Sequence, residues 1–378
     1  MPGVQEVLGV QEVQRVRGRA RVQVAATAIA ILGCATAAAA QDPHPTFTVG
    51  TATASRGAMA TGVIHVPAGV DAGYDIPVAV VHGARPGPVL AVVSGAHGTE
   101  YASIVAVEML MAGAPTPAVD PASLSGTLIL VPLVNVNSFE KITPHVNPVD
   151  NKSMNRFYPG STSGTQTERA SYAITKEVVE KCDHLIDLHG GDLDENLRPY
   201  SYWTVTGNQK QDDFSKGMVL AFGLDHIIIS SDRPRDPNAS RFLENTASTR
   251  GKPSFTAEAG RSGPVESGDA EVLVKGVRGV MAYLKMTDGT PAPNPHPVWV
   301  DRIVSVASER DGMFYPAVAR NARVVKGARV GVIRDYWYKT IAEVTAPEAG
   351  IVMFVRALPS LKKGDTIVNI GTIKPAGK

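Results

Sequence analysis

The chain has 378 residues, of which 44% are hydrophobic and 19% are charged, a composition typical of a globular protein with one large and one smaller domain. Its 37 basic and 36 acidic residues leave a formal net charge of +1, and only 6% of the residues are aromatic. These values exclude a strong overall field for nucleic acid or an anionic membrane, so we expect a small-molecule or peptide partner and no nucleic acid.

The first forty residues have the pattern of a secretory signal peptide. A basic run over 15–21 precedes an apolar stretch over 22–40, which is rich in small residues and ends in an A-x-A arrangement. We therefore expect a signal peptide over 1–40 and an exported protein, periplasmic or secreted, with no stable membrane span in the mature chain. A transmembrane anchor is the alternative, although the stretch is short for a span. A minor alternative is a lipoprotein anchored through Cys34.

The two cysteines fit this prediction. Cleavage after residue 40 removes Cys34, so the mature chain keeps Cys182 alone and has no intramolecular disulfide. Cys182 ends a helical pattern just before a strand, where we expect a buried structural thiol.

Strands and helices alternate through most of the chain. Short apolar runs predict strands at 88–95, 126–135, 184–191, 226–230 and 254–260. Apolar residues at helical spacing predict helices at 100–113, 167–182 and 269–286. This alternation predicts an α/β domain over 41–290, built as a three-layer sandwich around a mixed, largely parallel sheet.

The composition changes at 287–299, a proline-rich run that reads as a linker. Beyond it the chain consists of short strand patterns separated by glycine and proline. We therefore expect a small all-β domain over 297–378. Its pattern resembles the barrel-sandwich of lipoyl and biotinyl carriers, without the modified lysine that those carriers hold in a turn.

Three of the predicted strands end in residues that suit a metal ion. His97 follows the strand at 88–95, and Glu100 stands three residues later. The next two strands of this kind end in His189 and Glu258. Open α/β sheets gather their ligand sites at the carboxyl ends of strands. Two imidazoles and one carboxylate with an open fourth position form a recurring catalytic zinc set.

Each of these residues also has an ordinary structural explanation. The histidine–glutamate pair could cap a helix, His189 could be a hydrogen-bonded residue at a strand end, and Glu258 could be a buried ion-pair partner. Asp187 could orient His189 or could be a polar core residue. The location of all three groups at predicted strand ends favours a joint function.

Four motifs carry a family resemblance. They are "SGAHGTEYAS" (94–103), "MNRFYPG" (154–160), "IDLHGG" (186–191) and "TAEAG" (256–260). In order and spacing they resemble the motifs of the succinylglutamate desuccinylase/aspartoacylase family, which are relatives of the zinc carboxypeptidases. The resemblance covers essentially the whole mature chain, and it implies a zinc carboxypeptidase-like fold followed by a β-rich part.

The resemblance also implies roles for individual residues. His97, Glu100 and His189 would ligate one zinc ion per chain. Glu258 would act as general base for a metal-activated water and would then deliver a proton to the leaving amine.

In the same family pattern, Asn155 and Arg156 would hold an anionic group of the substrate, and a guanidinium grips a carboxylate in a two-pronged way that lysine cannot match. The alternative for Arg156 is a surface ion pair.

The sequence departs from the family pattern at one point. Members of this family carry a further arginine shortly before the Asn-Arg pair, and residues 139–154 contain none. Lys141, His145 and Lys152 are the basic residues there, and Arg261 is a candidate from another loop.

Together, the motifs and the N-terminal pattern predict an exported zinc-dependent amidohydrolase that acts on carbon–nitrogen bonds other than peptide bonds. We expect it to cleave an N-acyl amino acid or a similar small amide that bears a carboxylate. The alternatives are a metallocarboxypeptidase that releases a C-terminal amino acid from short peptides, and a non-catalytic protein that holds zinc. The sequence leaves the acyl group, the amino acid and the oligomeric state open.

Overall fold

The computed structural model describes residues 44–113, 117–264 and 267–373. The expected signal peptide at 1–40 and Cys34 lie outside the described residues, and both expectations stay predictions. Within the described ranges, no helix is both long enough and apolar enough to cross a membrane.

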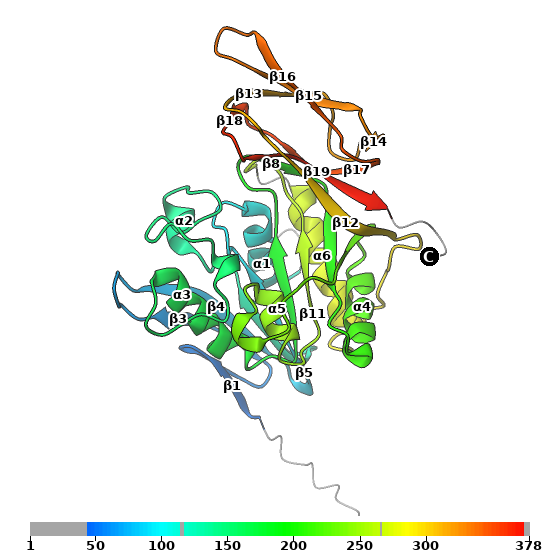
Figure 1. Cartoon of the computed structure of the whole chain (residues 1–378). Coiled ribbons are helices and arrows are strands. Elements are labelled where there is room, and N and C mark those ends of the chain that lie inside the picture. Colours follow the sequence, from blue (N-terminus) through cyan, green and yellow to red (C-terminus); the bar gives the residue numbers. More distant parts are fainter. Residues whose placement is uncertain (1–43, 114–116, 265–266, 374–378) are drawn as a thin grey trace, which may run out of the picture. The chain divides into compact units, whose positions relative to one another are not determined.

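A 13-stranded mixed sheet runs through the protein (Figure 1). From one edge to the other its strands are β3 (Ala58–Val66), β4 (Tyr74–His82), β6 (Ser125–Val131), β5 (Arg85–Ser94), β7 (His184–His189), β11 (Ser254–Glu258), β9 (Tyr200–Thr204), β10 (His226–Ser230), β12 (Val298–Ala307), β19 (Thr366–Ile373), β17 (Gly350–Arg356) and β14 (Arg323–Val324). Strand β8 (Glu195–Leu197) pairs with β17. The run β6-β5-β7-β11 is parallel, and so is β9-β10-β12. The expected mixed sheet is therefore confirmed.

Helices cover both faces of the sheet. One face carries α1 (Tyr101–Ala112), α4 (Gln209–Phe222) and α6 (Ser267–Tyr283). The other carries α3 (Gln166–Ile174), the π-helix η2 (Thr175–Val179), α5 (Leu243–Ser248) and the hairpin of β1 (Thr46–Val49) and β2 (Ala52–Ser55). The short helices are α2 (Val136–Glu140), η1 (Met154–Arg156) and η3 (Pro237–Ala239). This arrangement confirms the three-layer α/β sandwich.

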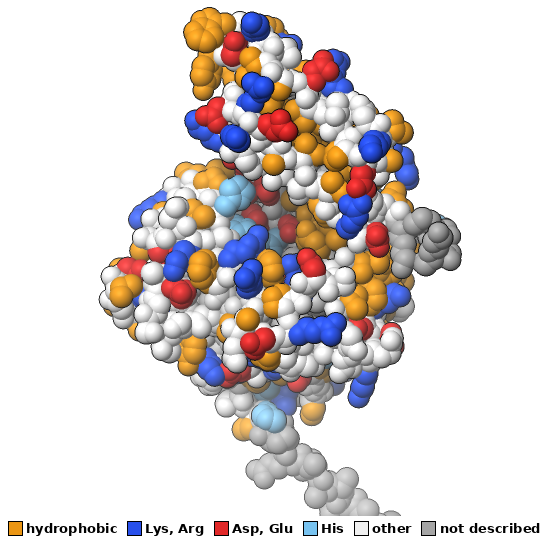
Figure 2. All heavy atoms as spheres, in the orientation of Figure 1, with side chains coloured by type: hydrophobic (Ala, Val, Ile, Leu, Met, Phe, Trp, Pro, Cys, Tyr) orange, Lys and Arg blue, Asp and Glu red, His pale blue; other side chains and the backbone are white. Residues whose placement is uncertain are grey.

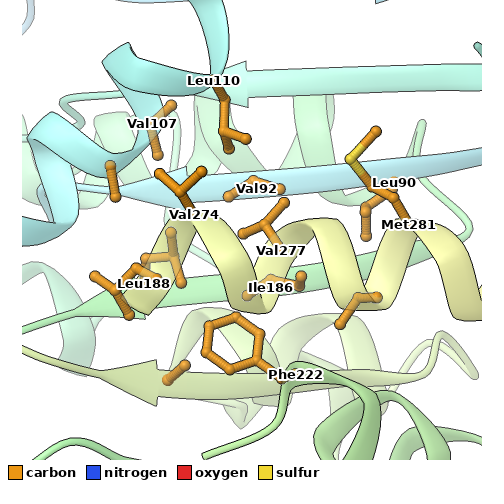
Figure 3. Packing of buried hydrophobic residues seen from close by; sticks show 14 of the residues in the cluster. Leu90, Val92, Val107, Leu110, Ile186, Leu188, Phe222, Val274, Val277 and Met281 are labelled. Atoms are coloured by element: carbon orange, nitrogen blue, oxygen red, sulfur yellow. The ribbon is translucent and has the colours of Figure 1, made fainter. Parts of the chain in front are cut away.

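Strand β5 shows why the sheet is buried on both sides. Its alternating residues point to opposite faces, so Leu90 and Val92 enter one core while Ala91 and Val93 enter the other. Figure 3 shows Val92 near Val274 and Val277 of α6 and Leu90 near Met281, within the first of these cores. The strand is thereby packed against other side chains on both of its faces.

The C-terminal strands form the expected β-rich part. A four-stranded sheet contains β16 (Thr340–Thr345), β15 (Arg329–Arg334), β13 (Gly312–Pro316) and β18 (Ser360–Leu361). It shares a buried core with β14, β17 and β19. Strand β12 runs parallel to β10, so these strands continue directly from the α/β sheet. The boundaries at 41–290 and 297–378 stay predictions.

The parallel strands β5, β7 and β11 bring their carboxyl ends to one edge of the sheet. Glu258, which ends β11, pairs in register with His189, which ends β7. Ser94, which ends β5, pairs with Leu188 of β7. The strand ends that the sequence singled out are therefore neighbours.

Two glycines shape the loop between β5 and α1. Gly95 has a φ of 68°, a left-handed backbone conformation that favours glycine, and a Cβ there would lie 2.8 Å from Leu133 Cα. A Cβ on Gly98 would lie 2.3 Å from the backbone nitrogen of Phe139. Both positions therefore need glycine for the loop to carry His97 back toward the sheet edge.

Candidate functional site

Three side chains from separate segments converge at this edge. His97 lies in the loop after β5, Glu100 immediately precedes α1, and His189 is the last residue of β7. Nδ1 of His97 lies 2.6 Å from Oε1 of Glu100, and Nδ1 of His189 lies 2.8 Å from Oε2. The structure thus brings the three predicted metal ligands together.

Glu100 does not act as a helix cap through its side chain. It occupies the N-cap position of α1, yet its carboxylate accepts no hydrogen bond from the first turn of that helix. One carboxylate oxygen faces His97, while the other faces His189 and accepts a hydrogen bond from the backbone N–H of Gly190 at 3.1 Å. The capping explanation for the motif is therefore wrong.

The donor set fits a zinc ion. One candidate donor atom from each of His97, Glu100 and His189 lies within 4.8 Å of the others, and two nitrogens with one carboxylate match a catalytic zinc set. The other ring nitrogens have neighbours that would fix the ring orientations. Nε2 of His97 lies 3.1 Å from Oγ of Ser153. Nε2 of His189 lies 2.7 Å from the side-chain amide of Asn155.

Charge and burial shift the pKa values at this centre. Burial alone raises the pKa of Glu100, but the two imidazoles beside it more than offset this and hold the pKa below its usual range. Burial lowers the pKa of His189, while the carboxylates of Asp187 and Glu100 raise it well above its usual value. The buried carboxylate of Glu100 is therefore strongly favoured in its charged form, which is the form that binds a cation.

A cavity of about 800 Å³ opens over these residues. Six residues that the sequence predicted line it: His97, Glu100, Asn155, Arg156, His189 and Glu258. The β-rich part contributes Arg302, Phe354 and Asn369 to the same lining. Figure 2 shows histidine and acidic side chains in a hollow on this face.

Glu258 lies next to the metal centre and faces the cavity. Burial raises its pKa well above the usual value, and the negative charges of Glu100, Glu195 and Asp187 raise it further, against the effect of His189. A carboxyl group that readily takes up a proton beside a metal centre suits general acid–base chemistry.

Asn155 and Arg156 lie on η1, on another wall of the site. Asn155 is buried, and its Oδ1 has no hydrogen-bond partner among the described residues. Arg156 is exposed to the cavity, where one terminal nitrogen donates to the backbone oxygen of Asn155 at 2.6 Å. Its guanidinium carbon stands 4.9 Å from the ring centroid of Phe242. The guanidinium of Arg156 is thus available to a ligand, whereas the amide nitrogen of Asn155 already contacts His189.

The sequence offers four basic residues in place of the arginine that family members carry before the Asn-Arg pair. One of the four lines the cavity. Lys141 is exposed and stands outside the lining, and Lys152 forms an ion pair with Glu168 at 2.8 Å. Arg261 also lies outside the lining. His145 is the candidate that faces the cavity.

His145 is held between carboxylates. Its Nε2 lies 2.8 Å from Asp194 and its Nδ1 lies 3.3 Å from Asp192. Burial lowers the pKa of His145, but the hydrogen bond to Asp194 and the charges of Asp192 and Glu195 raise it to about 9. Arg356 of β17 pairs with the second oxygen of Asp194 at 3.0 Å. His145 therefore places a positive charge at the cavity, although both ring nitrogens already face carboxylates.

Sequence reasoning missed Arg233, which also lines the cavity. Its signal was available, because it follows the predicted strand 226–230 by three residues, and residues just after parallel strands gather at sites. The loop around it contains several charged residues, and nothing in their spacing distinguishes Arg233 from Arg235.

Comparison with known proteins agrees with this geometry. One relative is the N-alpha-acetyl-L-2,4-diaminobutyric acid deacetylase of Halomonas elongata, 24% identical over 304 residues, which are 79% of this chain and 86% of the relative. A succinylglutamate desuccinylase from Silicibacter sp. TM1040 matches with a TM-score of 0.73 at 20% identity, over 84% of this chain and 95% of that one. The product-bound ectoine utilization protein EutE of Ruegeria pomeroyi matches with a TM-score of 0.75 at 21% identity, over 87% and 99%.

The two structural matches show a shared fold. Residues 86–284, more than half of the chain, match the family described as the succinylglutamate desuccinylase/aspartoacylase catalytic domain. This region contains every residue that the sequence assigned to the site. The chain belongs to the succinylglutamate desuccinylase/aspartoacylase family.

Proposed function

We propose that the protein is a zinc-dependent amidohydrolase that cleaves the acyl group from an N-acyl amino acid or a similar small amide bearing a carboxylate. The observation that carries this proposal is the convergence of His97, Glu100 and His189 beside Glu258 in one cavity. One zinc ion per chain fits the three ligands.

The chain's own residues supply the steps around the metal. A bound zinc ion supplies a water of lowered pKa, polarises the scissile carbonyl and favours ionised carboxylates nearby. Glu258 takes the proton from the attacking water on its carboxylate and passes it to the amide nitrogen as the amine leaves. His97, Glu100 and His189 keep the ligand geometry fixed, because each is anchored by a strand end or a helix start.

The opposite wall suits the carboxylate of the substrate. Arg156 offers guanidinium N–H groups to the cavity, and the neighbouring Asn155 also lines it. Guanidinium groups bind carboxylates through two parallel hydrogen bonds. The relative from Halomonas elongata is named for deacetylating an amino acid, which supports a substrate of this class.

A substrate screen tests the proposal and separates its alternatives. The panel contains N-acetyl and N-succinyl amino acids, with dipeptides and tripeptides as the second class, and the Glu258→Gln protein serves as the blank. Release of free amino acid from the acyl compounds supports the deacylase. Preferential release of C-terminal residues from the peptides would favour the metallocarboxypeptidase. Zinc binding without hydrolysis of either class would indicate the non-catalytic protein.

We also propose that the protein is exported after removal of residues 1–40. The basic run, apolar stretch and A-x-A ending support this proposal. N-terminal sequencing of the protein recovered from an expressing bacterium should begin at Gln41. An intact N-terminus on protein recovered from the cytoplasm would contradict export.

A further inference from the structure

Two arginines approach the same aromatic ring in the cavity wall. The guanidinium carbon of Arg156 lies 4.9 Å from the ring centroid of Phe242, and that of Arg233 lies 3.9 Å from it. Arg156 belongs to η1, and Arg233 belongs to the loop after β10. Segments that are far apart in the chain thus bring two cations to one wall.

Neighbouring groups hold the side chain of Arg233 in place, but its two terminal amino groups stay available for a ligand. Its Nε forms an ion pair with Oε1 of the buried Glu244 at 2.9 Å, and its side chain is 16% exposed. The guanidinium also stands 5.8 Å from the ring centroid of Tyr202. Among the residues that the structure describes, none accepts a hydrogen bond from its two terminal amino groups. Four N–H donors are therefore left for a ligand.

The wall carries an excess of positive charge. Desolvation lowers the pKa of Arg156, and the nearby charge of Arg233 lowers it further, which shows that the two cations repel each other. Glu244 is the carboxylate that pairs with Arg233, so one net positive charge remains. A single carboxylate placed between the guanidiniums would remove this repulsion.

Beyond this wall, the cavity lining carries charges of both signs. It includes the acidic side chains of Glu195, Asp232 and Asp301 and the basic side chains of His145 and Arg302.

We propose that Arg233 is a second substrate-binding residue, which together with Arg156 binds the carboxylate of an N-acyl amino acid. This inference rests on the proposed function and adds to it a residue that holds the substrate. The ring of Phe242 supports both guanidiniums from one side, and Glu244 fixes the direction of Arg233.

The test compares an acid with its uncharged counterpart. The kinetic constants kcat and KM are measured for the best N-acetyl-L-amino acid of the screen and for its C-terminal carboxamide. In Arg233→Gln and Arg233→Lys, KM for the acid should rise about tenfold to a hundredfold, because hydrogen bonds to a charged group are lost, while kcat changes little. For the carboxamide, KM should rise by less than about threefold.

Arg233→Lys keeps a cation beside Glu244, so it remains informative where Arg233→Gln fails to fold. Arg235→Gln is the matched control, since Arg235 is an exposed arginine of the same loop outside this cavity, and it should match wild type. Equal losses for acid and carboxamide, or equal behaviour of the Arg233 and Arg235 variants, would overturn the inference.

A binding measurement distinguishes failure of this inference from failure of the proposed function. Calorimetry with N-acetyl-L-methionine and the Glu258→Gln protein measures affinity without turnover, and adding Arg233→Lys should weaken it about tenfold to a hundredfold. Binding that depends on Arg233 in a wild-type protein that hydrolyses nothing would contradict the proposed function alone. Hydrolysis that is indifferent to Arg233 would contradict the inference alone, and a protein that neither binds nor hydrolyses would contradict both.

Discussion

Asp187 and His189 project from the same side of β7, and Oδ1 of Asp187 lies 3.3 Å from Nε2 of His189. This nitrogen is the one turned away from Glu100, because Nδ1 faces that carboxylate. The carboxylate of Asp187 is buried and has no hydrogen-bond partner of good geometry among the described residues. Asp187 and the side-chain amide of Asn155, 2.7 Å from the same nitrogen, therefore both contact Nε2 and hold the ring with Nδ1 turned toward Glu100.

We predict that Asp187→Asn weakens zinc binding about tenfold to a hundredfold, as expected when a carboxylate that orients a metal-binding histidine is removed. Competition with a chromophoric chelator measures the affinity. Asp183→Asn is the matched control, because Asp183 is an exposed aspartate that precedes the opposite end of the same strand. An unchanged affinity in Asp187→Asn would mean that Asp187 is only a polar core residue.

Substitution of Glu258 and substitution of a proposed metal ligand should have different effects on zinc content. Glu258→Gln should lower kcat by about a hundredfold to ten-thousandfold while keeping the zinc content of wild type, because the group that moves the proton is lost and the ligands remain. Steady-state kinetics and elemental analysis of one preparation check both points. Turnover near that of wild type would remove Glu258 from the proposed chemistry.

Glu168 should make the stability of the fold depend on pH. Its carboxylate closes a capping box at the start of α3 and accepts a hydrogen bond from Nζ of Lys152 at 2.8 Å. The bonds from Lys152 and from the backbone of Thr165 hold the pKa of Glu168 below its usual 4.5. Since the folded-state pKa is lowered, the stabilisation is complete above the usual pKa and is lost as the pH falls through the folded value.

Glu168→Ala should therefore lower the free energy of unfolding by about 1 kcal/mol at pH 7 and by less at more acidic pH. Urea unfolding at pH 7 and near pH 4 measures the difference. Glu180→Ala is the control, because the pair between Glu180 and Lys176 is more exposed, and it should lower the free energy of unfolding less than Glu168→Ala does. An equal loss from Glu168→Ala at both pH values would argue against the carboxylate as the cause.

Cys182 should be unreactive in the folded protein. Its side chain is 1% exposed, and burial raises the pKa of the thiol to about 12. At pH 8 only about one thiol in ten thousand is then ionised, and the thiolate is the reactive form. In a Cys34→Ser background, Ellman's reagent should detect no thiol under native conditions and one per chain in urea. Rapid native reaction would show that the region around Cys182 opens.

The convergence of the candidate site residues was predictable because parallel strands bring their ends to one edge. His97, His189 and Glu258 each follow an apolar strand, so the strand pattern alone indicated that they meet. The structure also excludes capping of α1 by the side chain of Glu100, which the sequence could not do. That exclusion depends on where the carboxylate points, and two different histidines fix its direction.

Arg233 and His145 mark the limit of such reasoning. Their positions depend on loops whose paths are set by distant partners, such as Glu244 for Arg233 and Arg356, through Asp194, for His145. Local sequence patterns contain no trace of these pairings.

The secondary structure predicted from the sequence was also incomplete. One helix was expected over 167–182, but α3 passes into a π-helix at Thr175, and an apolar stripe does not reveal an extra residue in a turn. Strands β1 to β3 were not predicted, because their exposed and buried residues alternate without a continuous apolar run over much of their length. Strand β4 was also missed, although it contains the apolar run 76–81.

The most direct test of the proposed chemistry is a zinc titration of metal-free enzyme with the best N-acyl amino acid of the screen. Hydrolysis should be absent after chelation, rise linearly with added zinc and level off at one ion per chain, because His97, Glu100 and His189 form one ligand set. The His97→Ala protein should show no such rise. Full activity after chelation, in protein shown by elemental analysis to lack metal, would contradict the account.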